Sequence, residues 1–361
     1  MSPAAAETSA AGLISARQAM NTRRRWLVGV FLLFLALLAT GIALKELVAP
    51  GLVRSRLILA VKENCGTCEL SLGRIDISLL PPALSASGVS FTGGTPNATV
   101  IHAEAERVYL PVSLLPLFKS RLRLGFIKIS DSRVTVTEGD LYAAPSAKDG
   151  PARPLDLEIE GLGVKNSSFT YIREHAGRKG SIAVTRINAS IGPVGVSARL
   201  RDKDVEASAD GLLEQSGQFS LQIRARLFAK APDLDVKLRI EGQDLAALNA
   251  FFKPTDAVQL KGQLIEGRST VEIRGARLKA ASYVRYKGLK VRIKKSGERG
   301  ALSAFFQTFL ASATMGKQNA ADDGYDRTGS VELERKPKET IISFALRGMK
   351  EGAMKVSSQA R

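Results

Sequence analysis

The sequence predicts a mainly β protein that begins with a transmembrane helix. Apolar and polar residues alternate with a period of two along most of the chain, and 32 glycines supply turns between the alternating runs. Residues 26–44 form a run of 19 positions without a charge. A helix needs about 20 such residues to cross the ~30 Å hydrocarbon core of a bilayer, so this run predicts a membrane anchor.

The first 48 residues are predicted to form a tail and an anchor. Residues 1–22 are rich in Ala, Ser and Thr and indicate a disordered cytoplasmic tail, and residues 23–48 contain the transmembrane helix. Arg23, Arg24 and Arg25 precede the uncharged run directly, so the positive-inside rule keeps the N-terminus in the cytoplasm and exports the remaining chain. A cleaved signal peptide is the alternative, although its apolar segment is usually only about 7–15 residues long.

The charge of the chain favours an anionic partner. With 52 Lys and Arg against 35 Asp and Glu, the formal net charge is +17. Export removes nucleic acid as the default partner, which leaves membrane lipids or an acidic polymer.

A helix and a cysteine pair follow the anchor. Residues 49–63 carry spaced apolar positions and predict an amphipathic helix that continues past the membrane. Cys65 and Cys68 have the C-x-x-C spacing, but haem attachment requires a histidine directly after the second cysteine, and Glu69 stands there. A structural zinc site needs four ligands, and the only histidines that could join the two cysteines, His102 and His175, have no recognisable spacing. We expect a structural disulfide formed in an oxidising compartment, with a redox pair or idle thiols as the alternatives.

The β part is predicted in two segments, residues 64–138 and 155–355, joined by a Gly- and Pro-containing linker loop at 139–154. In the first segment a phase slip at Phe126-Ile127 predicts a β-bulge. The alternating runs, with one apolar and one polar face, predict an antiparallel sheet. They include residues 70–79, 122–129, 219–227, 234–240 and 289–293.

Two helices are expected within the second segment. Residues 244–254 open with Asp244 as a helix cap and end before Pro254. Residues 300–316 predict an amphipathic helix that packs on the sheet or plugs its end, in preference to a ligand site. Its apolar stripe, the candidate groove or plug, consists of Leu302, Phe305, Phe306, Phe309 and Leu310.

The sequence contains no catalytic constellation. The G-x-S-x-G, Walker, H-E-x-x-H and G-x-G-x-x-G motifs are all missing, and the two histidines are isolated. We therefore expect neither an enzyme nor a cofactor or metal site.

A basic run lies late in the chain. Residues 261–300 hold twelve Lys or Arg against three acidic residues. The run is either a solvated sheet face or a patch for lipid phosphates. The candidate anionic-lipid patch consists of Lys287, Lys290, Arg292, Lys294 and Lys295.

Several segments resemble the AsmA-like family of bacterial envelope proteins. They are "GRIDISLLPPALSASGVSF" (73–91), "AERVYLPVSLLPLFKSRLRLGFIKISDSRVTVT" (105–137), "LDLEIEGLGVKNSSFTYI" (155–172) and "RLKAASYVRYKGLKVRIKK" (277–295). Three features depart from the family. Lys287 and Gly288 stand where an acidic residue is frequent, the cysteine pair is not part of the pattern, and the chain is shorter than the large relatives that are thought to conduct phospholipid between membranes. The resemblance implies a curved antiparallel sheet that forms a groove, apolar inside and polar outside.

The resemblance also implies a function. It leads us to expect a single-pass inner-membrane protein with its bulk in the periplasm, which binds or transfers lipid in envelope maintenance. Anionic phospholipid or lipopolysaccharide is the expected partner. The alternative is a membrane-tethered scaffold or assembly factor for outer-membrane proteins, which binds an envelope protein in place of lipid.

Overall fold

The computed structural model describes residues 49–65, 67–94, 99–113, 121–138, 156–175, 177–195, 203–226, 233–293, 328–336, 339 and 341–359. The predicted tail (1–22) and the predicted anchor (23–48, with Arg23, Arg24 and Arg25) lie outside these residues. So do the predicted linker at 139–154 and the stripe from Leu302 to Leu310. Residues up to Leu57 belong to one compact unit and Ile58–Arg361 to another.

Strands dominate the described residues, which confirms a mainly β chain with few helices. The elements in chain order are α2 (Ala49–Asn64), β1 (Glu69–Ser71), β2 (Ile75–Leu79), β3 (Pro82–Gly94), β4 (Thr99–Ser113), β5 (Arg121–Glu138), β6 (Asp156–His175), β7 (Arg178–Gly192), β8 (Val194–Gly195), β9 (Val205–Leu213), β10 (Gly217–Arg226), β11 (Asp233–Asp244), α3 (Asn249–Asp256), β12 (Val258–Arg274), β13 (Arg277–Ile293), β14 (Thr328–Glu334) and α5 (Ile341–Gln359).

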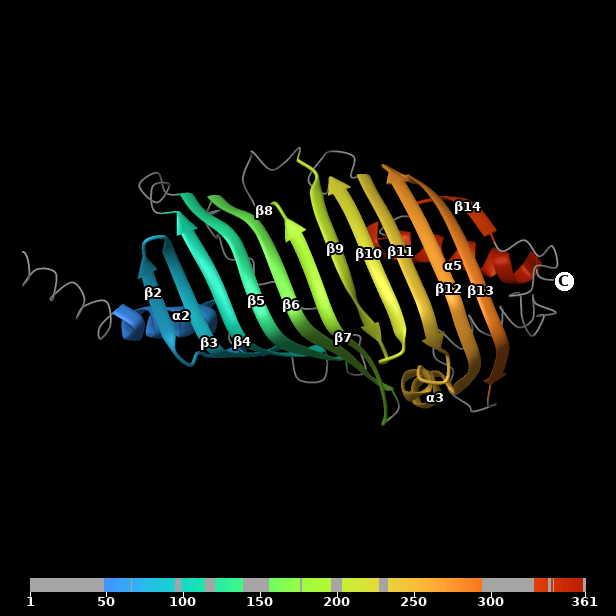
Figure 1. The fold of residues 1–361 in the computed structure, drawn as a ribbon, viewed down its shortest axis with the longest axis horizontal. Helices are drawn as coiled ribbons and strands as arrows, with labels where there is room; N and C mark the ends of the chain where they lie inside the picture. Colours follow the sequence, from blue (N-terminus) through green and yellow to red (C-terminus); the bar gives the residue numbers. More distant parts are fainter. Residues whose placement is uncertain are drawn as a thin grey trace, which may run out of the picture. The chain divides into compact units, whose positions relative to one another are not determined.

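The strands form one open, curved sheet of 14 strands (Figure 1). Its order is β1-β3-β4-β5-β6-β7-β9-β10-β11-β12-β13-β14, with β2 beside β3 and β8 beside β6. The two predicted β segments therefore share a single sheet. The expectation of an entirely antiparallel sheet is wrong at one place, because β5 and β6 pair in parallel from Arg121↔Asp156 to Glu138↔Arg173.

Left-handed residues in neighbouring strands bend the sheet. Asp131 in β5, Asn166 in β6 and Arg186 in β7 have φ of 53°, 49° and 52°, and the register shifts between β6 and β7 and between β7 and β9 at this level. Bulges increase the local twist and bend of a strand. The side-chain amide of Asn166 donates to Asp131 Oδ1 over 2.5 Å, so the bulges in adjacent strands are tied together. The bulge predicted near Phe126 is also present, since β5 has an extra residue between Leu124 and Lys128 opposite β4.

Helix α5 covers the sheet at its C-terminal end, where the sequence predicted β structure up to residue 355. It contacts β12, β13 and β14, and it lies behind the strands in Figure 1. The helix approaches closely because Gly348 faces Leu278, where an added Cβ would lie 2.6 Å from Leu278 Cδ2. We call the face that α5 covers the inner face and the opposite one the outer face. Phe344 is fully buried, and the core cluster around it is completed by Ala225, Leu234, Val236, Val271, Ile273, Leu278, Ala280 and Ala345.

Helix α3 differs from its prediction. It begins at Asn249 instead of Asp244 and continues through Pro254 to Asp256. Asp244 instead accepts the backbone N–H of Ala246, so its carboxylate stabilises the turn before the helix. Pro254 is the sixth of the eight residues of α3, so its missing N–H costs one hydrogen bond in the last turn of a helix that ends two residues later.

The region from residue 49 to residue 79 agrees with the prediction in outline. Helix α2 is present, and its Leu52 and Leu59 are exposed. The strand expected at 70–79 is split into β1 and β2, which both pair with β3.

Candidate functional site

The inner face contains one row of apolar side chains that crosses seven neighbouring strands. Residues opposite each other in a sheet point to the same face, so the row is continuous. Cross-strand pairing joins its members from β6 to β13 in the order Leu162, Ile191, Ala207, Ile223, Val236, Val271 and Ala280.

Burial changes sharply along this row. Val236, Val271 and Ala280 retain only 6%, 1% and 4% of their accessible surface because α5 covers them. Leu162 and Ala207, further along the same row, are only half-buried. Within the described residues, α5 makes its extensive contacts with β12–β14 alone. From β10 towards β6, the apolar side chains of this row therefore lie beyond the part of the inner face that α5 covers.

A hollow of about 170 Å³ lies in this uncovered part, across β6, β7, β9 and β10. Three of its lining residues are alanines, and Ala189 pairs with Ala209 across β7 and β9. Since an alanine side chain is a single methyl group, the floor is low here, while Val164 and Leu221 flank it. The complete lining consists of Leu162, Val164, Ala189, Ser190, Ile191, Ala207, Ser208, Ala209 and Leu221.

Helix α3 borders the sheet at one end of the strands. It contacts β6, β7 and β12, although β9, β10 and β11 lie between β7 and β12 in the sheet. Phe251 is 7% exposed and lies 5.8 Å, centroid to centroid, from Tyr171 of β6. The guanidinium of Arg173 lies 5.2 Å above the Phe251 ring. The curvature of the sheet thus brings β6 and β7 to the same helix as β12.

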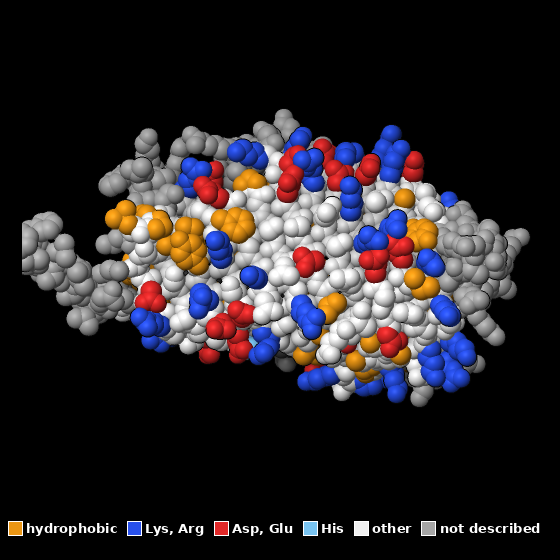
Figure 2. Space-filling model, in the orientation of Figure 1, with side chains coloured by type: hydrophobic (Ala, Val, Ile, Leu, Met, Phe, Trp, Pro, Cys, Tyr) orange, Lys and Arg blue, Asp and Glu red, His pale blue; other side chains and the backbone are white. Residues whose placement is uncertain are grey.

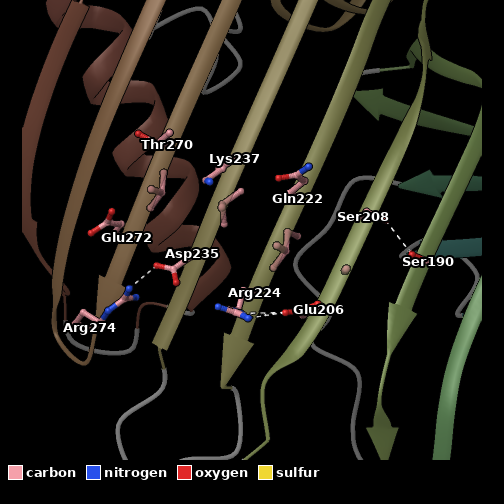
Figure 3. A pocket seen from close by; sticks show the side chains of 14 residues that line it. Ser190, Glu206, Ser208, Gln222, Arg224, Asp235, Lys237, Thr270, Glu272 and Arg274 are labelled. Carbon is pink, nitrogen blue, oxygen red and sulfur yellow. Dashed lines mark hydrogen bonds and ion pairs between the residues drawn. The ribbon is translucent and has the colours of Figure 1, made fainter.

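Charged side chains are spread over the right-hand part of the outer face, whereas hydrophobic side chains gather at its left (Figure 2). A broad hollow of about 660 Å³ lies over β7 and β9–β12, and Figure 3 shows its side chains spread over several strands instead of converging on one point. Arg224 Nη2 lies 2.8 Å from Glu206 Oε1, and Arg274 Nη2 lies 2.7 Å from Asp235 Oδ1. The hydrogen bond to Glu206 raises the pKa of Arg224 above its ordinary value. These groups neutralise one another across the strands, which is the arrangement of a solvated sheet face.

The predicted site residues are partly within the described chain. Cys65 and Cys68 are joined by a disulfide with their Cα atoms 5.2 Å apart, at the end of α2. Lys287, Lys290 and Arg292 lie on β13 and are exposed. Among the described residues no three His, Cys, Asp or Glu side chains gather as metal ligands would. The predicted site residues outside the described chain are Lys294, Lys295, Leu302, Phe305, Phe306, Phe309 and Leu310.

The sequence analysis did not identify the residues of the hollow. Ala207 and Ala209 alternate with polar neighbours in β9, so the signal for their common face was present in residues 205–213. The sequence did not show which strand lies beside β9. Ala189 lies next to these alanines because of the register in which β7 pairs with β9.

The chain was compared with protein-family models and with curated proteins. No protein-family model and no curated protein matches it. Within the described residues no helix has the length and apolarity needed to cross a membrane.

Proposed function

We propose that the chain is an AsmA-like protein of the bacterial inner membrane, which holds lipid acyl chains against the uncovered inner face in the periplasm. In this proposal residues 23–48 are the anchor, and lipid binding or transfer serves maintenance of the cell envelope. The uncovered apolar row beyond α5 is the observation that carries the proposal, since apolar side chains gain free energy when a partner removes them from water.

The chemistry of the hollow favours a hydrocarbon ligand. Its inward side chains are Leu, Ile, Val and Ala, which offer no hydrogen bond to a polar ligand. Each methylene group of an acyl chain that leaves water contributes about 0.8 kcal/mol. A polar substrate would gain nothing comparable from this surface.

The dimensions of the inner face also suit an acyl chain. A second row of half-buried side chains crosses the sheet from β4 to β10. Five strand spacings of ~4.8 Å give this row a width of about 24 Å. One leaflet of a ~30 Å hydrocarbon core is about 15 Å thick, so a lipid chain fits across the row. Pairing joins its members in the order Val108, Ile129, Val164, Ala189, Ala209 and Leu221.

The test is photo-crosslinking with the full-length chain. A phospholipid with a photoactivatable group in its acyl chain is added, and the crosslinked peptides are mapped. The mapping separates lipid held on the sheet from lipid that surrounds the predicted anchor. We expect adducts on peptides that contain Val164, Ala189 and Ala209.

Two neighbouring substitutions give a matched comparison. Ala209→Trp fills the hollow, whereas Ser220→Trp adds the same side chain on the outer face of the neighbouring strand, because Ser220 precedes Leu221 and successive residues of a strand point to opposite faces. We expect the first variant to lose the sheet adducts and the second to retain them. Adducts confined to residues outside the sheet, or equal in both variants, contradict lipid binding here and favour a protein-binding scaffold.

A further inference from the structure

A group of four cations lies on the outer face at one end of β12 and β13. Lys261 of β12 and Lys287, Lys290 and Arg292 of β13 are all exposed. Lys261 pairs directly with Lys290, and the other two cations pair with uncharged glutamines, Lys287 with Gln263 and Arg292 with Gln259. Figure 2 shows basic side chains gathered at the corresponding end of the sheet, below its right-hand side. We call these four residues the basic end.

A bulge places the lysines of β13 on one face. Lys287 and Lys290 are three residues apart, so a regular strand would point them to opposite faces. Gly288 has φ 64°, and the register between β12 and β13 shifts at Lys261/Gln263, where β13 contains one extra residue. The extra residue restores the alternation, and all three β13 cations share the outer face with Lys261.

The basic end differs from the rest of the same two strands. Further along, three cations are paired: Arg268 Nη2 lies 2.5 Å from Glu266 Oε1, Arg274 Nη2 lies 2.7 Å from Asp235 Oδ1, and Lys279 Nζ lies 3.3 Å from Glu332 Oε1. Within the described residues none of the four cations of the basic end forms an ion pair. Like charges placed directly opposite each other destabilise a sheet, so the Lys261–Lys290 pair costs stability in the isolated chain. An anionic partner would remove that cost.

We propose that the basic end docks on the anionic headgroup surface of a lipid bilayer. Three of its four cations are lysines, which act as hydrated point charges and require no fixed geometry in the partner. Bidentate recognition of a single phosphate uses the paired N–H groups of arginine, and Arg292 is the one arginine among the four cations. Sites for single-stranded nucleic acid add exposed aromatic rings. Tyr286 is the one aromatic residue in 258–264 and 286–293, and it is 3% exposed and points to the inner face, because it precedes Lys287 in the strand.

This inference goes beyond lipid binding in the hollow, because the two surfaces lie on opposite faces of the sheet. The hollow would hold the acyl chain of one lipid molecule. The basic end would bring that sheet to a membrane surface, and it does so whether or not the hollow is filled. The two proposals therefore fail independently.

The experiment measures capture of vesicles by the full-length chain. The chain is held in phosphatidylcholine nanodiscs, and vesicles of phosphatidylcholine with or without phosphatidylglycerol are added. The test variant is Lys287→Gln/Lys290→Gln. The control is Lys237→Gln/Lys279→Gln, which removes the same charge from the outer face of β11 and β13.

We expect capture only with phosphatidylglycerol. Each lysine near an anionic surface contributes about fivefold in affinity (~1 kcal/mol), so the test variant loses about 25-fold. The control keeps wild-type capture, since Lys279 lies about eight residues or 26 Å along the strand from Lys287, which is beyond the ~8 Å Debye length. The test variant also unfolds at the same or a higher temperature than the wild type, because it removes the Lys261–Lys290 repulsion.

Four results would overturn the inference. They are capture without phosphatidylglycerol, an equal loss in the control, displacement by inorganic phosphate but not by chloride of the same ionic strength, and tighter binding of duplex DNA through the same lysines. The third result would assign the basic end to a discrete phosphate site, and the fourth would assign it to nucleic acid.

Discussion

Replacing Phe344 with alanine tests whether α5 is what stabilises the C-terminal end of the sheet. The Phe344 side chain is fully buried against apolar residues of β10–β13. Truncating a buried aromatic residue to alanine costs about 3–5 kcal/mol of unfolding free energy. The upper part of that range applies here because the strands are held by backbone ladders on both sides and cannot move into the cavity. The Arg347 guanidinium, 5.0 Å above the Phe344 ring, adds ~0.5–1 kcal/mol.

The assay combines urea unfolding of the full-length chain with hydrogen exchange resolved by peptide. Phe344→Ala should reduce amide protection in β12, β13 and β14, which α5 contacts, while β3 and β4 keep theirs. Leu346→Ala is the control, since Leu346 is 60% exposed and its truncation should cost no more than about 0.5 kcal/mol. Equal losses for the two variants, or a loss of protection spread evenly over the sheet, would refute the reasoning.

Two further predictions concern side-chain hydrogen bonds that stabilise the fold. The hydrogen bond from Arg347, followed by that from the backbone N–H of Lys336, lowers the pKa of Glu339 from 4.5 to about 2, so the stability it contributes is present above pH 4.5 and is lost as the pH falls towards 2. Thermal unfolding should show the difference between wild type and Glu339→Gln shrinking over that window, and a constant difference argues against it. Asn166, with φ 49°, should tolerate glycine better than alanine, because alanine adds about 1–2 kcal/mol of left-handed strain to the lost bond to Asp131. Urea unfolding in which Asn166→Ala is more stable than Asn166→Gly would contradict this.

The strands themselves could be predicted because successive residues of a strand point to opposite faces, so apolar and polar residues alternate when one face is buried. Residues 219–223 and 234–240 alternate without interruption and form β10 and β11 with the expected apolar face. Alternation says nothing about the direction of the neighbouring strand, however, so the parallel pairing of β5 with β6 had no signal in either strand.

Features that depend on distant residues escaped prediction. The buried positions of α5, such as Phe344, Gly348 and Val356, recur at helical spacing, but two of its buried positions are glycines, which are poor helix formers. They are buried because a close approach to Leu278 and Ser282 requires them, which is known only once the sheet exists. The residues of the hollow escaped for the same reason, since strands β7 and β9 bring their alanines together only through the register.

Curvature and coverage together account for the uncovered part of the inner face. A helix packs on a sheet over only a few strands, and α5 occupies the end nearest β14. The left-handed residues of β5, β6 and β7 bend these strands, and α3 meets both β7 and β12. Filling the space between these helices with larger side chains at Ala189, Ala207 and Ala209 would have buried more apolar surface within the chain itself. The alanines at these adjoining positions instead leave a hollow in the sheet surface beyond the strands that α5 covers. For this reason we propose that a ligand binds on β6–β10.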